Sequence, residues 1–253
     1  MPSRTASSHF KLPRTLVRPT FPEVTRAALH AASPNVGNAS VEFIRETLLE
    51  TSHQMISGTS ALSPSHLPSA LPKSSLPSFI TVPLRPPRDS VHPYYPTHAL
   101  AISNSSPSES SDTLLIFPIH ALVLAAHCSK LPVLPPPAQR TSASVHLPVL
   151  SLTVPSAPAF AILLAFMYSH RLDAVLDALF PVPPFLLAQT HTQNAHLCAA
   201  SKANVQVLMI HTAHVKDVWQ DMVALGIDDV ALWDTVELAY QIVLGALNLA
   251  LMK

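Results

Sequence analysis

The middle of the chain alternates between short apolar runs and segments rich in proline or polar residues. Apolar runs of about four to eight residues between turn formers are typical of strands, and three of them predict strands near 99–103, 113–117 and 147–154. The polar segment between the first two runs predicts a hairpin. Two further runs, 120–128 and 159–168, have the length and the alanine and leucine content of buried helices.

The last third of the chain carries helical periodicity, and no proline follows Pro184 to interrupt it. Gly226 is a favourable residue for ending a helix. Asp228 and Asp229 suit the positive end of the helix that comes next. We therefore predict helices over 173–179, 186–200, 204–225 and 228–252.

The first third has a different pattern, because 14 of the 26 prolines precede Thr97 and serine is frequent. We predict that residues 1–97 are mostly disordered, with extended proline-rich chain after residue 57. One exception is a predicted amphipathic helix over 40–55, for which Ser40 is a suitable N-cap. That helix either docks on its own domain or meets a partner. A short edge strand at 79–82 is the other exception.

Together these elements predict an α+β fold in which a small sheet is surrounded by helices. We expect a core domain over residues 98–180, followed by a helical extension over 181–253 that packs on it. The predicted fold therefore has a largely disordered proline- and serine-rich N-terminus, a mixed core and a helical C-terminus.

Composition narrows the class of function. Charged residues make up only 12% of the chain and the formal net charge is zero, so no basic footprint for nucleic acid is present. The four glycines make a glycine-rich nucleotide-binding loop improbable. Two cysteines are too few for a disulfide framework, and the first twenty residues contain no apolar signal block. We expect an intracellular protein, nuclear or cytoplasmic, that does not bind a membrane.

The fourteen histidines raise the question of metal binding or catalysis. His196, Cys198, His211 and His214 have donor atoms that zinc accepts, but their spacing matches no standard zinc module. His127 and Cys128 are adjacent on a predicted helix, so their side chains diverge and do not form a nucleophilic pair. We therefore expect no catalytic residue, no metal site and no cofactor, and a protein that is not an enzyme.

The order of strand, buried helix, strand and buried helix resembles the BTB/POZ domain. Phe117-Pro-Ile-His120 and Val123-Leu-Ala-Ala126 resemble the first motif of that family. The resemblance implies a structural role for His120 at a turn from strand to helix. The second motif is carried by Pro158, Phe160, Leu163, Leu164, Phe166, Tyr168 and Leu172.

Three departures from the BTB/POZ pattern bear on function. Ala121 replaces the usual basic residue, Ser169-His170 replaces Thr-Gly, and the segment 131–144 replaces a shorter connection. The BTB/POZ resemblance implies a cullin adaptor as one alternative function, but the second and third departures disfavour that contact.

The whole chain, with its proline-rich head, divergent core and helical tail, resembles the clampless family of basidiomycete fungi. That resemblance implies a regulator of mating-type-dependent formation of clamp cells and of the dikaryon. It would act by contact with a protein partner, for example a transcriptional regulator, or as a homodimer, without binding nucleic acid directly. The BTB-like motif residues would form either the core or the association surface: Phe117, His120, Leu122, Val123, Phe160, Leu164 and Tyr168. An unrecognised histidine-dependent enzyme is a further alternative.

Overall fold

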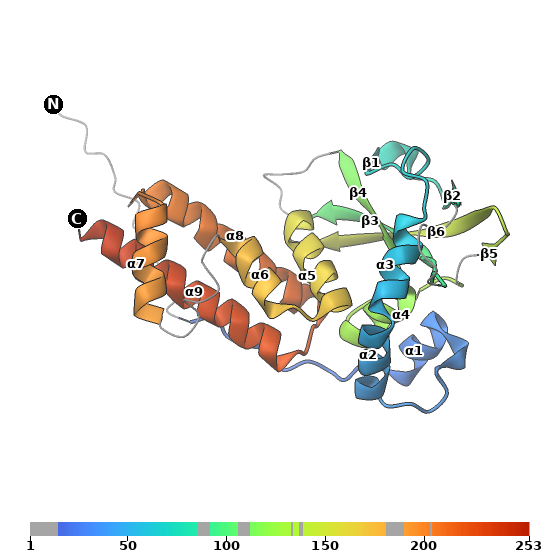
Figure 1. Cartoon of the computed structure of the whole chain (residues 1–253), viewed down its shortest axis with the longest axis horizontal. Helices are drawn as coiled ribbons and strands as arrows, with labels where there is room; N and C mark the ends of the chain where they lie inside the picture. Colours follow the sequence, from blue (N-terminus) through green and yellow to red (C-terminus); the bar gives the residue numbers. More distant parts are fainter. Residues whose placement is uncertain are drawn as a thin grey trace.

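A computed structural model shows the chain as a sheet-containing lobe beside a helical lobe (Figure 1). It describes residues 15–85, 92–105, 112–132, 134–136, 139–180, 190–202 and 204–252. Helices α1–α4 lie with the sheet, helices α6–α9 form the second lobe, and α5 lies between the two (Figure 1). The predicted α+β class is therefore confirmed.

The most buried strand, β3, lies at the centre of the sheet. Its order is β1-β4-β3-β6-β2, and β5 pairs with β6 outside this path. The hairpin predicted between the first two apolar runs is present as antiparallel β3 and β4, whereas β6 runs parallel to β3. The strands are β1 Ala70–Pro72, β2 Phe79–Pro83, β3 His98–Asn104, β4 Thr113–Ile119, β5 Gln139–Arg140 and β6 Ser144–Val154.

Strand β3 separates two hydrophobic cores. Because side chains alternate along a strand, Leu100 and Ile102 face the larger core, which contains the helices. Ala99 and Ala101 face a smaller core on the other side of the sheet. Ile80 and Val82 of β2 complete that second core, so the predicted edge strand at 79–82 is confirmed and is structural.

Strand β4 continues through Pro118, where we had predicted its end. Pro118 pairs with Ala99 of β3, while β1 pairs with β4 only from Thr113 to Leu115. A proline lacks an N–H, and it is tolerated at a strand position where no neighbour needs that donor. Pro118 lies beyond the paired segment of β1, so the strand does not need to end there.

The prediction of disorder is wrong for residues 15–39, while residues 1–14 lie outside the described part of the chain. Helix α1 (Arg26–Ala32) begins at Thr25, whose side chain accepts a hydrogen bond from the Ala28 amide. It buries Leu29 and Ala32 against the larger core. The helix was missed because its apolar face is only two turns long.

The prediction of extended chain after residue 57 is wrong as well. The segment contributes part of a helix and the strands β1 and β2, and two of its prolines lie at strand ends. Pro72 and Pro83 each occupy the last position of a strand. At that position the backbone N–H that proline lacks contributes little to the hydrogen bonds between strands. Residues 86–91 lie outside the described chain.

The helix predicted over 40–55 is two helices, α2 (Val41–Glu50) and α3 (Ser52–Ser60). Ser40 is the N-cap, as predicted, and its hydroxyl accepts the Phe43 amide. The break falls at Thr51, whose hydroxyl donates to the carbonyl of Thr47. Ile44, Leu48 and Met55 are buried, so the helix pair docks on its own domain.

The two buried helices predicted in the core are present as α4 (Ala121–His127), one residue shorter at each end than the predicted run, and α5 (Ala157–Ser169). Pro158 lies in the first turn of α5, as predicted. Helix α5 ends at His170, which adopts a left-handed conformation with φ of 50°. This is the position at which the BTB/POZ pattern has glycine, the residue that favours that conformation.

The second lobe contains α6 (Leu172–Leu179), α7 (Thr190–Ala200), α8 (Val205–Leu225) and α9 (Val230–Leu251). Gly226 ends α8 in a left-handed conformation, and Asp229 caps α9 by accepting the Leu232 amide. By length and composition alone, α9 is long and apolar enough to cross a membrane, but half of that stretch is buried inside the protein. It packs on α6, α7 and α8 as a core helix.

Candidate functional site

The two BTB-like motifs meet in a buried pair of side chains, His120 and Tyr168. The Tyr168 hydroxyl lies 2.8 Å from His120 Nδ1 and 3.0 Å from the His120 amide nitrogen. His120 Nε2 lies 3.0 Å from the carbonyl oxygen of Tyr94. One arrangement satisfies every group: Nε2–H donates to Tyr94, while the hydroxyl donates to Nδ1 and accepts from the amide.

Burial favours the uncharged form of both side chains in this pair. Burial lowers the pKa of His120 to about 4, although its bond to the Tyr94 carbonyl acts in the opposite direction. Burial likewise raises the pKa of the Tyr168 hydroxyl. At neutral pH His120 is therefore an uncharged structural group that fixes the Tyr94 backbone to the start of α4.

Two more contacts fix the same corner of the fold. The Thr97 hydroxyl accepts the Ala121 amide at 2.8 Å, which satisfies a free donor at the start of α4. Gly58 of α3 also lies close to the Tyr94 carbonyl group. A Cβ atom at Gly58 would lie 1.7 Å from the Tyr94 carbonyl oxygen, so only glycine permits this approach.

A groove of about 450 Å³ opens beside this corner, between α2–α3, the segment 93–97, the start of α4 and β5–β6. We call it the Tyr94 groove. Tyr94 is 52% exposed, and the Arg140 guanidinium lies 5.2 Å from the centre of the Tyr95 ring. Arg140 supplies the charge among its lining residues, which are Ala32, Ser33, Thr47, Leu48, Thr51, Met55, Pro93, Tyr94, Tyr95, Pro96, Thr97, His120, Ala121, Leu122, Arg140 and Val145.

The seven residues predicted from the BTB-like motifs lie mainly in the interior. Phe117 and Phe160 meet edge to face at 5.5 Å between ring centres. Val123 and Leu164 are buried in the larger core. Leu122 is half-buried and lines the Tyr94 groove together with His120. Leu122 is thus the apolar motif residue that lines the groove.

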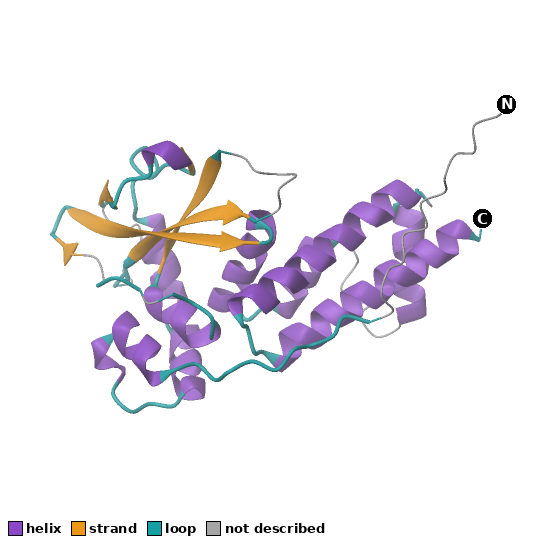
Figure 2. Ribbon diagram, turned by 180° about the vertical axis from the view of Figure 1, so that it is seen from behind, coloured by secondary structure: helices purple, strands orange, loops and turns teal. Residues whose placement is uncertain are grey.

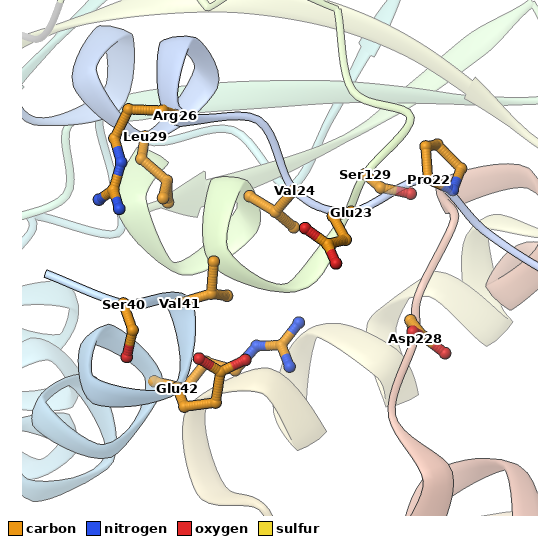
Figure 3. A pocket seen from close by; sticks show the side chains of 11 residues that line it. Pro22, Glu23, Val24, Arg26, Leu29, Ser40, Val41, Glu42, Ser129 and Asp228 are labelled. Carbon is orange, nitrogen blue, oxygen red and sulfur yellow. The ribbon is translucent and has the colours of Figure 1, made fainter. Parts of the chain in front are cut away.

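A second hollow, of about 640 Å³, lies between α1, α2 and the loop before α9 (Figure 3). Figure 3 shows Glu23 and Glu42 on different elements around it, with Asp228 on the far side. Arg26 also borders it, but the guanidinium donates to the carbonyls of Ala39 and Asn38. We call this hollow the polar pocket. Its charges are of both signs, so it does not favour an ion of either sign.

His127 and Cys128, the residues considered for thiol chemistry, are buried. His127 Nδ1 lies 2.8 Å from the Val123 carbonyl, and its Nε2 lies 3.0 Å from Nε2 of His170. Burial lowers the pKa of His127 to about 4 and raises the pKa of the Cys128 thiol to about 12. Within the described residues, no three His, Cys, Asp or Glu side chains are grouped to hold a metal ion.

Sequence reasoning missed the residues that shape the Tyr94 groove. Tyr94 and Tyr95 lie between Pro93 and Pro96, and a tyrosine pair flanked by prolines was a usable signal within the segment predicted as linker. Arg140 could not have been found, because its place depends on β5 folding back on β6.

Comparison with known proteins shows the family. The Clampless protein 1 N-terminal domain matches residues 19–155, and the Clampless protein 1 C-terminal domain matches residues 173–253. Clampless protein 1 of Cryptococcus neoformans var. neoformans serotype D, from strains JEC21 and B-3501A, is 31% identical over 117 residues. That alignment covers 46% of this chain and 24% of the relatives, so the chain spans about a quarter of their length.

No solved structure matches the chain, so the BTB/POZ resemblance stays a prediction. The N-terminal family domain alone spans more than half of the 253 residues. This chain therefore belongs to the clampless protein 1 family.

Proposed function

We propose that this protein is a non-enzymatic interaction module that regulates clamp-cell formation during mating-type-dependent development in a fungus. It acts inside the cell by docking a segment of a partner protein in the Tyr94 groove. Membership of the clampless protein 1 family suggests the developmental role. The observation that carries the docking mechanism is the groove itself, an apolar hollow with exposed tyrosine on its wall.

The chemistry of the groove indicates what it would bind. Tyrosine and proline side chains form flat apolar walls of the kind that extended, proline-containing segments recognise. Arg140 adds one positive charge, and its guanidinium suits a carboxylate of the bound segment. The expected ligand is therefore an extended apolar segment that contains proline and carries one acidic residue.

The state of His120 favours binding over catalysis. A general base needs a free ring nitrogen and a pKa near the working pH. Both ring nitrogens of His120 have hydrogen-bond partners, and its pKa is about 4. The histidine nearest the groove is thus suited to hold the groove wall in place.

A double substitution in the fungus tests this function. Tyr94→Ala with Arg140→Glu removes the exposed ring and reverses the charge, yet keeps the Tyr94 carbonyl that His120 needs. We expect the number of clamp cells to fall to the level of a strain lacking the gene, while the protein remains present at its normal amount.

The matched control makes the same kinds of change on α8. Ile210 is exposed and Lys216 lies on the surface of that helix, so Ile210→Ala with Lys216→Glu also removes one apolar side chain and reverses one charge. This control should leave clamp-cell numbers unchanged. Normal clamp formation in the groove variant would contradict the proposed mechanism.

A further inference from the structure

Residues 15–24, which we call the strap, run from α1 toward the helical lobe as extended chain (Figures 1 and 2). The strap is assigned to neither a helix nor a strand. Pro19 and Pro22 fix their own φ and disfavour a helical conformation at Arg18 and Phe21, the residues before them. The N-terminal family domain begins within it, at residue 19, yet the strap lies against residues of the C-terminal family domain.

Three kinds of contact tie the strap to the C-terminal family domain. The Leu16 amide donates to the Glu237 carboxylate at 3.0 Å. The Arg18 guanidinium pairs with the Asp228 carboxylate at 2.5 Å. The Phe21 ring stacks on Trp233 with 6.0 Å between ring centres. Backbone, charge and aromatic ring are therefore each recognised by the C-terminal domain.

The strap is nevertheless packed loosely. The Arg18–Asp228 pair is exposed to solvent on both sides, and such pairs contribute at most about 1 kcal/mol. A hollow of about 130 Å³ lies beside Leu16 and Arg18, and the polar pocket of about 640 Å³ lies beside Pro22 and Val24. A segment with few hydrogen bonds and hollows along its length opens at low cost in free energy.

The surface beneath the strap has the character of a peptide site. Trp219, Trp233, Asp234 and Glu237 line the smaller hollow, so two indole rings lie beside two carboxylates. The Trp219 Nε1 atom is buried without an acceptor in the described part of the chain. Acidic side chains around aromatic rings favour a ligand with a positive charge and an aromatic ring.

We propose that this surface is a second docking site, and that the strap is its resident occupant. The ligand is an extended, proline-containing segment of a partner protein with a basic residue and an aromatic residue three positions later, as in Arg18 and Phe21. The strap competes with that partner, so docking requires the strap to be released. The site is separate from the Tyr94 groove and selects a basic segment, whereas the groove selects an acidic one.

The test uses the full chain and a fluorescently labelled peptide with the sequence of residues 15–24. In the variant Arg18→Glu with Phe21→Ala, the strap loses its ion pair and its ring contact. We expect the peptide to bind this variant at least tenfold more tightly than the wild-type chain, as measured by fluorescence anisotropy. Adding Asp228→Lys to the released variant should abolish that binding, because the peptide arginine then loses its partner.

Val17→Ala is the matched control within the strap, since Val17 is 72% exposed. It should leave peptide affinity at the wild-type value. A released variant that keeps its cooperative melting but does not bind the peptide overturns the proposal. If light scattering shows that the released variant becomes a dimer, the occupant is a second copy and the partner assignment is overturned.

A second measurement applies if the released variant does not fold. The wild-type chain is then mixed with excess peptide, and hydrogen exchange of the Leu16 amide is followed, because that amide donates to Glu237. Exchange that accelerates as peptide is added supports competition for one site. Exchange that is unchanged at the highest peptide concentration overturns it.

Discussion

At the scale of single residues, the fold depends on histidines that are neutral and fully hydrogen-bonded. His120, His127 and His98 are buried, and burial lowers the pKa of each. Each ring is oriented by a backbone carbonyl, namely that of Tyr94, Val123 or Pro135. The high histidine content of the sequence thus reflects, at these positions, polar links within the core.

Removing one hydroxyl group tests the His120–Tyr168 pair. Tyr168→Phe leaves Nδ1 and the amide of His120 without their partner inside the protein. Each unsatisfied buried polar group costs about 1–3 kcal/mol and two are left here, so we expect the free energy of unfolding to fall by at least about 2 kcal/mol. Urea denaturation measures it. Tyr94→Phe makes the same chemical change on an exposed ring and should cost less than about 0.5 kcal/mol; equal losses would show that the pair has no special role.

The buried histidines also predict how stability depends on pH. The pKa of His120 and of His127 falls from 6.5 to about 4 on folding, so between these values the unfolded chain binds more protons and stability rises with pH. Asp221 opposes this trend, because burial raises its pKa to about 7 and its contribution decreases as pH rises. Because two histidines raise the stability with pH and one carboxyl group lowers it, we expect a net rise in the free energy of unfolding from pH 4 to 6.5.

The variant Asp221→Asn separates the two effects. Without the titrating carboxyl group, the free energy of unfolding should rise more steeply with pH than in the wild-type chain. The difference between the two proteins should grow up to about pH 7, the pKa of Asp221. Urea denaturation at several pH values between 4 and 8 provides the measurement. A flat pH profile for the variant would show that the histidines are not buried in the neutral form.

At the scale of elements, the sequence pattern located most helices and strands but missed those with short apolar faces. Helices α5, α8 and α9 were predicted because their apolar runs are long and their ends carry proline, glycine or aspartate signals, and α4 was predicted from its continuous alanine- and leucine-rich run. Helix α1 and strand β1 were not predicted, because each buries few residues and lies among prolines. Their positions are fixed by contacts distant in sequence, which periodicity does not report.

The candidate site was only partly predictable for the same reason. His120 and Tyr168 were found because both belong to motifs, although their contact spans 48 positions in the sequence. The groove beside them was missed because its walls come from five separate segments. Gly58 shows the limit clearly: the sequence marks it only as a glycine within a helical pattern, and its need for glycine comes from Tyr94.

Gly58→Ala tests how closely α3 must approach the Tyr94 backbone. The added Cβ would overlap the carbonyl that accepts the His120 hydrogen bond, so α3 or the segment 93–97 must move. Overpacking typically costs about 1–3 kcal/mol, and we expect a loss of free energy of unfolding in that range. Gly37→Ala is the control, because only its positive φ opposes the substitution and no atom lies within 4 Å of the new Cβ. A smaller loss at Gly58 than at Gly37 would contradict the close packing.

At the scale of the whole molecule, two family domains are joined by α5, by the strap and by contacts of the loop after α4. Ser129 and Lys130 of that loop donate to the Gly226 and Leu225 carbonyls at the end of α8. The Lys130 amine also lies 5.1 Å from the centre of the Phe21 ring. The Tyr94 groove and the hollow beside the strap therefore lie on different family domains, so the two proposed sites can be tested by separate substitutions.

The most direct test of the account is photo-crosslinking in the fungus with a benzophenone amino acid in place of Tyr94. The exposed side chain at this position lies at the groove, so we predict a discrete adduct with one partner protein during clamp formation. The same probe at Ile210 should give no such adduct. Absence of an adduct at Tyr94, an identical adduct at Ile210, or an adduct of twice the chain's own mass would contradict docking of a distinct partner in the Tyr94 groove.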